Sequence, residues 1–282
     1  MNSKIIISAF VLGLTLTACG GGGNPGTTVD TTISLTLNSS IEGGSTTFSA
    51  LLLRRLFGGS NTNTTGIVLL HGRGGNPDSA VVRQLRKDLY SRGHITLSIQ
   101  EAVPATYIEG DSVNKPPFQA YIDDINNSEN NVFPETYARV RTAINELESR
   151  GMTQVVVIGF SLGSRIAAAH VARGHVDELP IIGLVGIGMY AGLSDPDPLR
   201  TTLTLDEVII PVLDIYGDLD TASATTADAR KAAYGGNIPD YTQIELSCDV
   251  GLSPADCHKL VNLKGTTTSP LEVAVSNWIA NL

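Results

Sequence analysis

The 282-residue chain has few basic side chains: 19 Lys and Arg stand against 28 Asp and Glu, and the formal net charge is −9. Proteins that bind nucleic acid need a basic surface to neutralise phosphates. The sequence has no basic stripe and no long run of one charge. We therefore expect no nucleic-acid partner, and the acidic excess mainly favours solubility.

The N-terminus lacks an apolar run long enough for a mature membrane-spanning helix. Residues 5–16 form an apolar stretch of twelve residues, whereas a span needs about 20. The stretch follows Lys4 and is succeeded by small residues, which is typical of a secretory signal. Residues 1–18 resemble a bacterial lipoprotein signal, after which Cys19 would be lipidated. The alternative is a plain signal peptide cut at a nearby small residue.

Residues 19–30 contain four consecutive glycines and predict a flexible tether without a packed element. Several acyl chains on Cys19 would hold the exported protein firmly on a membrane of the cell envelope. Gly20, in place of an aspartate, indicates the outer membrane in a cell with two membranes. The protein would then face the periplasm or the cell surface.

Cysteine is scarce, with three residues in the chain. If Cys19 is lipidated, Cys248 and Cys257 remain, nine positions apart around a turn-prone stretch. Because an exported protein meets oxidising conditions, we predict a disulfide between them. The alternatives are two free thiols or a metal pair, but the pair lacks the further ligands of a zinc site. We therefore expect no metal.

After the tether, the sequence predicts one α/β domain over residues 31–282. Strands are expected at 31–37, 46–53, 66–70, 95–99, 155–158, 181–187, 212–216 and 241–246. Helices are expected at 78–90, 134–150, 162–173, 225–234 and 270–282. This alternation predicts a mainly parallel sheet covered on both faces, with ligands at the C-terminal ends of its strands. The irregular stretch 101–133 either roofs that edge or is a solvated surface insertion.

The motif Gly159-Phe160-Ser161-Leu162-Gly163 lies between a predicted buried strand and a predicted helix. A strand, a sharp turn and a helix present the turn serine at the edge of the sheet, and the strained turn needs small neighbours. Ser161 is thus the candidate nucleophile, and the Leu162 amide at the helix N-terminus is a candidate oxyanion donor. The alternative is a tight turn with a passive serine.

The stretch from His71 to Gly75 follows another buried strand and supplies a second candidate for oxyanion binding. Its glycines allow the backbone to approach a reacting carbonyl closely. The Arg73 amide is the preferred donor, with Gly72 as the other candidate. We expect His71 to pack under this loop.

The acid and base of such a site should follow the serine in the order acid, then histidine. His258 is the histidine that comes after a plausible acid on a later strand, and the predicted disulfide would brace its loop. Asp214, Asp218 and Asp220 lie in or just after the strand at 212–216. Asp214 is interpreted as structural and Asp220 as the acid, with Asp218 as the rival. At the end of the strand at 181–187, Met189 and Tyr190 are candidate pocket residues.

With these motifs in place, the chain resembles the α/β-hydrolase superfamily and a group of bacterial exported hydrolase-like lipoproteins. The resemblance is carried by GIVLLHGRGGNPDS, LRKDLYSRGHITLSIQ, VVVIGFSLGS and VLDIYGDLD between residues 66 and 220. It implies an α/β-hydrolase fold with an eight-stranded sheet whose second strand is antiparallel. It also implies a triad of Ser161, Asp220 and His258. The short segment 187–212 leaves no room for a large cap domain.

These features predict a serine hydrolase that cleaves acyl esters through an acyl-enzyme and needs no cofactor. A peptidase or amidase would use the same triad. A protein of another class, a non-catalytic hydrolase-like lipoprotein that binds an envelope partner, is the remaining alternative.

Overall fold

The computed structural model describes residues 32–41, 44–54, 63–101, 134–172, 179–191, 199–234, 241–249, 251–260 and 269–282. The predicted signal sequence, the tether, Cys19 and residues 102–133 lie outside these described residues. No helix in the described ranges is both long enough and apolar enough to span a membrane.

Eight strands form one sheet in the order β1-β2-β4-β3-β5-β6-β7-β8. The strands are β1 (Thr32–Ile41), β2 (Gly44–Leu53), β3 (Thr65–Leu70), β4 (Ile95–Ile99), β5 (Gln154–Phe160), β6 (Ile181–Ile187), β7 (Val212–Gly217) and β8 (Tyr241–Leu246). Strand β2 pairs antiparallel with both β1 and β4, and the other neighbours are parallel. The predicted eight-stranded sheet with an antiparallel second strand is confirmed.

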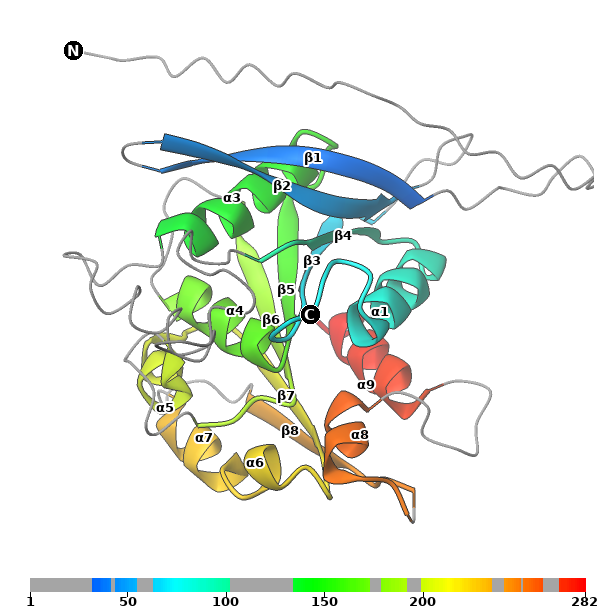
Figure 1. The fold of residues 1–282 in the computed structure, drawn as a ribbon, viewed down its shortest axis with the longest axis vertical. Helices are drawn as coiled ribbons and strands as arrows, with labels where there is room; N and C mark the ends of the chain where they lie inside the picture. Colours follow the sequence, from blue (N-terminus) through cyan, green and yellow to red (C-terminus); the bar gives the residue numbers. More distant parts are fainter. Residues whose placement is uncertain are drawn as a thin grey trace, which may run out of the picture.

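Helices cover both faces of this sheet, as predicted (Figure 1). The longer ones are α1 (Ala80–Ser91), α3 (Pro134–Glu148), α4 (Leu162–Ala172) and α9 (Pro270–Ile279). Figure 1 shows α3 and α4 on one side of the sheet and α1 and α9 on the other. The short helices are α5 (Thr201–Thr204), η2 (Leu205–Glu207), α6 (Thr221–Ala224), α7 (Ala227–Ala233) and α8 (Pro254–Lys259).

The central strands bury both of their faces, which explains their continuous apolar sequences. In β5, Val155 and Val157 face the core under α3 and α4, whereas Val156 and Ile158 face the core under α1 and α9. This alternation follows from the two-residue period of a strand. The sheet is therefore a rigid platform whose C-terminal edge can carry a site.

The described chain between β6 and β7 contains only α5 and η2, so no large cap domain is present there, in agreement with the prediction. One prediction about local structure was wrong: His258 lies on the helix α8 and not on a loop. Ser253 caps this helix by accepting a hydrogen bond from the Asp256 amide, and Pro254 occupies its first turn. These are ordinary start signals of a helix, in a segment too short to show a periodic pattern.

Candidate active site

Ser161 stands at a sharp turn between β5 and α4, with a left-handed backbone (φ 55°). This conformation is costly for a residue with a side chain and persists only where the surroundings enforce it. The Ser161 amide donates to the Ile187 carbonyl at 2.8 Å, and the Ser161 carbonyl accepts from the Ser164 hydroxyl at 2.5 Å. The turn predicted from the sequence is therefore present and held from both sides.

The two glycines of the motif allow strand and helix to approach each other closely. A Cβ atom on Gly159 would lie 2.2 Å from the Gly163 carbonyl oxygen, and a Cβ on Gly163 would lie 2.5 Å from the His71 carbonyl oxygen. No side chain fits at either position. The motif thus needs glycine at both positions for steric reasons.

His258 and Asp220 form a direct pair at the C-terminal edge of the sheet. His258 Nδ1 lies 2.6 Å from Asp220 Oδ2, and the two side chains are 24% and 6% exposed. Burial favours the neutral form of Asp220, but hydrogen bonds from His258 and Ser223 and the charge of His258 outweigh it, and the pKa of the carboxyl is lowered. Because a carboxylate accepts this hydrogen bond, it orients the ring and leaves Nε2 on the other side.

The other two aspartates of this region have different partners. Asp218 Oδ1 accepts a hydrogen bond from the Cys248 amide at 2.9 Å. Asp214 is fully buried and receives hydrogen bonds from Arg230 Nε at 2.9 Å and from the Tyr241 hydroxyl at 2.8 Å. Asp214 is therefore a structural residue, as its place inside a strand predicted. Asp220 is the aspartate that contacts His258.

The His258 ring lies beside the residues that directly follow β6, the strand that pairs with the serine-bearing strand β5. Its centroid is 5.1 Å from that of Phe160, and a Cβ on Gly188 would lie 2.7 Å from His258 Cε1. Within the described part of the chain, no hydrogen bond joins the Ser161 hydroxyl to His258. Such contacts in free enzymes are commonly long and tighten when substrate binds.

The loop from His71 to Gly75 lies against the serine turn. A Cβ on Gly72 would lie 3.1 Å from Ser161 Cβ, and the Gly75 amide donates to the Gly72 carbonyl at 3.0 Å to close a tight turn. Arg73 occupies that turn, and its side chain is exposed; its role as the second oxyanion donor stays a prediction. In the described structure, the Leu162 amide, the first of α4, donates to no protein acceptor, as expected at a helix N-terminus.

His71 packs beneath this loop, in agreement with the prediction. Its Nδ1 donates to the Gly72 carbonyl at 2.8 Å, and its Nε2 accepts from the Glu101 amide at 3.2 Å. Burial lowers the pKa of His71 and outweighs the opposing effect of the Gly72 contact. The neutral ring therefore ties the loop after β3 to the residues after β4.

The prediction of Met189 as a pocket residue was wrong, whereas that of Tyr190 stays a prediction. Met189 is fully buried in the hydrophobic core, with its methyl group packed over Gly186. Tyr190 is half-buried, its ring lies 4.2 Å from the Arg165 guanidinium, and its hydroxyl accepts a hydrogen bond from the same group. Both side chains have packing partners inside the fold, and the chain before them bends at Gly188, which has a positive φ.

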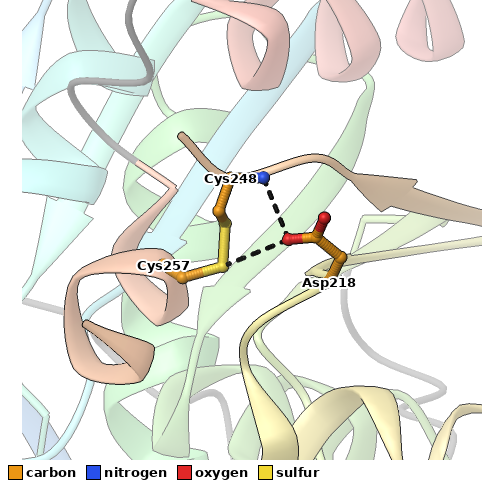
Figure 2. A group of neighbouring side chains, drawn as sticks. All are labelled: Asp218, Cys248 and Cys257. Carbon is orange, nitrogen blue, oxygen red and sulfur yellow. Dashed lines mark hydrogen bonds between the residues drawn. A yellow bond between two sulfur atoms is a disulfide. The ribbon is translucent and has the colours of Figure 1, made fainter. Parts of the chain in front are cut away.

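The predicted disulfide between Cys248 and Cys257 is present, with the two Cα atoms 5.7 Å apart. Figure 2 shows Asp218 beside it, in contact with the Cys248 amide and with Cys257 Sγ at 3.9 Å. These three residues are also the described group with ligand atoms spaced for a metal ion. Because the sulfurs are bonded to each other, they are not the thiolates that a metal would require.

Glu101 is a buried acid near the site that the sequence reasoning missed. It is 5% exposed, and its Oε1 would lie 2.6 Å from a Cβ on Gly163. Burial raises the pKa of this carboxyl well above its ordinary value. Its place directly after β4, at the C-terminal edge of the sheet, was the signal that could have marked it.

The strand order, the serine turn and the acid–histidine pair define an α/β-hydrolase fold with a candidate triad. Residues 38–263 match the family described as "Protein of unknown function (DUF3530)", and the chain belongs to that family. No protein of curated function matches the chain.

Several solved structures share the fold at low identity. An esterase from Pyrococcus furiosus superposes with a TM-score of 0.62 at 12% identity, over 93% of this chain and 95% of the esterase. A dienelactone hydrolase from Anabaena variabilis gives 0.55 at 17% identity, over 89% and 98%. An α/β serine hydrolase without lid from Xanthomonas campestris gives 0.57 at 15% identity, over 92% and 97%. At these identities the likeness concerns the fold.

Proposed function

We propose that the protein is a serine hydrolase that cleaves acyl esters, with Ser161 as nucleophile, His258 as base and Asp220 as the acid that orients it. The observation that carries the proposal is the 2.6 Å contact between His258 and Asp220 beside a serine held at φ 55°. A buried carboxylate behind an imidazole and a serine on a strained turn is the arrangement that acyl transfer requires.

In this proposal, Ser161 Oγ attacks the ester carbonyl carbon while His258 Nε2 takes the hydroxyl proton. The amides of Leu162 and Arg73 donate to the oxyanion of the tetrahedral intermediate. When the carbonyl re-forms, the alcohol leaves with the proton from His258. Water then repeats the sequence on the acyl-enzyme, giving the carboxylic acid and free Ser161.

An ester substrate is favoured over an amide by the likeness to an esterase and to a lidless serine hydrolase, both of which share this fold. Fold does not determine chemistry, and amidases use the same triad. Peptide amides are therefore assayed as controls beside the panel of esters.

The test is labelling by a fluorophosphonate probe, followed by hydrolysis of a panel of esters of increasing acyl length. Wild type and Ser149→Ala, a matched control at an exposed serine, should label and turn over equally. Ser161→Ala should do neither. Equal labelling of wild type and Ser161→Ala would defeat the proposal. Absence of labelling together with capture of one stoichiometric partner, unchanged in Ser161→Ala, would favour a binding protein.

We also propose that the chain is exported and anchored in the cell envelope through a lipidated Cys19. The support is the order of Lys4, the apolar stretch 5–16 and the cysteine that follows small residues. Metabolic labelling with palmitate should mark the full chain in a bacterial host and should be lost in Cys19→Ala. Equal labelling of both chains would refute the anchor at this position.

A further inference from the structure

Two aspartates at the end of β7, two residues apart, contact the same short segment of chain. Asp220 Oδ2 contacts His258 Nδ1 at 2.6 Å, and Asp218 Oδ1 contacts the Cys248 amide at 2.9 Å. The segment begins at Cys248, ends with α8, and is closed by the disulfide to Cys257, the residue before His258. The residues that follow β7 thus contact both the candidate base, through Asp220, and the segment that carries this base, through Asp218.

We propose that Asp218 is a positioning residue that acts through the Cys248–Cys257 disulfide to hold His258 against Asp220. This inference rests on the proposed function, because it assigns a task to the support of the catalytic histidine. It also gives a role to the aspartate that was the rival candidate for the acid.

The disulfide lies directly on the end of β7. A Cβ on Gly217 would lie 2.3 Å from Cys257 Sγ and 2.8 Å from Cys248 Sγ. Gly217 is thus required at this position, since any side chain would displace both sulfurs. The bridge is in this way seated between the strand that leads to Asp220 and the helix that carries His258.

Apart from the contacts of His258 with Asp220 and Phe160, few interactions hold helix α8 in place. It is six residues long, and helices this short are not stable by themselves. Cys257 is its one buried residue in the described structure. Lys259 and Asp256 bind each other on the exposed surface. The disulfide and the following residue Leu260, which is buried in the core under α1 and α9, therefore anchor the helix.

Asp218 fixes the other end of the bridge. Its carboxylate accepts the Cys248 amide and lies 3.9 Å from Cys257 Sγ, so one side chain contacts both halves of the disulfide (Figure 2). A hydrogen bond to a charged acceptor is stronger than a neutral one. Loss of this contact would let the bridge and α8 shift as a unit away from β7.

The experiment compares wild type with Asp218→Asn, Asp218→Ala and the double variant Cys248→Ser, Cys257→Ser. Asp228→Asn, at an exposed position on α7, is the matched control. Four quantities are measured: kcat and KM on the best ester of the panel, the thermal unfolding midpoint, and the downfield proton NMR resonance of His258 Nδ1–H. The Nδ1 resonance reports the contact with Asp220 without any need for turnover.

We expect the cysteine double variant to lose about 10- to 100-fold in kcat with KM nearly unchanged, since small displacements of a catalytic group cost this much. Asp218→Ala should lose about tenfold, and Asp218→Asn less, because the amide oxygen can still accept a weaker hydrogen bond. Adding Asp218→Ala to the cysteine double variant should cost little more, as expected for residues acting through one support. The Nδ1 resonance should weaken in the same order, while Asp228→Asn matches wild type.

Wild-type kcat and an unchanged Nδ1 resonance in a folded cysteine double variant would overturn the inference. Additive losses for Asp218→Ala and the cysteine variant would also overturn it, because Asp218 would then act without the disulfide. If Asp218→Ala or the cysteine variant fails to fold, Asp218→Asn decides by the same two readouts. If no variant, including wild type, is labelled or hydrolyses esters, the proposed function fails, and the Nδ1 resonance alone still tests the positioning.

Discussion

His258 Nδ1 and Asp220 Oδ2 lie 2.6 Å apart although their residues are 38 positions apart in the chain. Asp220 follows β7 and caps α6, where its Oδ1 accepts from the Ser223 amide, while His258 is carried by α8. Two short helices packed at the same sheet edge therefore bring the candidate acid and the candidate base together.

Asp220→Asn should lower kcat by about 10⁴-fold, as in triads whose acid loses its charge, because the histidine then takes the wrong tautomer. Initial rates on the best ester of the panel measure this. Asp218→Asn is the matched control, for which a far smaller loss is expected. Equal losses in the two variants would show that the acid has been misassigned.

The same pair predicts a dependence of stability on pH. The pKa of Asp220 is lower in the folded protein than the 3.8 of an ordinary aspartate. Its contribution to stability is thus present above pH 3.8 and is lost as the pH falls through the folded pKa. Urea unfolding between pH 2.5 and about 6 should show a shallower acid loss for Asp220→Asn than for wild type. Parallel curves would contradict this.

Glu101 predicts the opposite sign. Burial raises its pKa in the folded protein well above 4.5, so the folded state keeps a proton that the unfolded chain releases. Its contribution is complete below pH 4.5 and falls as the pH rises toward the folded pKa. Glu101→Gln should therefore gain stability relative to wild type at pH 8 but not at pH 4, by urea unfolding. Glu148→Gln, at an exposed position, should follow wild type at both pH values.

Because its backbone is left-handed, we expect Ser161 to lower the stability of the fold while it supports activity. A side chain at this φ costs about 1–2 kcal/mol that glycine avoids. Ser161→Gly should thus be more stable than Ser161→Ala by about 1 kcal/mol, while both are inactive. Chemical denaturation of the two variants measures the difference. Equal stabilities would mean that the turn is relaxed.

The buried ion pair of Asp214 and Arg230 predicts a loss of stability without a direct effect on chemistry. Both side chains are fully buried, and Arg230 Nε lies 2.9 Å from Asp214 Oδ2. Arg230→Ala should cost about 3–5 kcal/mol of unfolding free energy, because it leaves an unpaired buried charge. The kcat of the folded fraction should stay near that of wild type. The exposed control Lys231→Ala should change neither quantity.

Much of the fold could be predicted from sequence because its signals are local. Continuous apolar runs predicted the central strands, and the strand–glycine–serine–glycine–helix order predicted the turn at Ser161. The regions between these signals were less predictable. The helix predicted at 225–234 corresponds to α7, but the preceding α6 was not predicted and α8 was taken for a loop, because helices of four to six residues show no usable periodicity.

The sequence by itself determined the order of serine, acid and histidine, the two glycines that the turn requires, and the spacing of Cys248 and Cys257. Only the tertiary structure decided that Asp220 contacts His258 while Asp218 contacts the disulfide, since both follow the same strand. The tertiary structure also places Met189 in the core and Glu101 next to the serine turn. The physical reason is that these assignments depend on how loops and short helices pack at the sheet edge, where contacts join residues far apart in the chain.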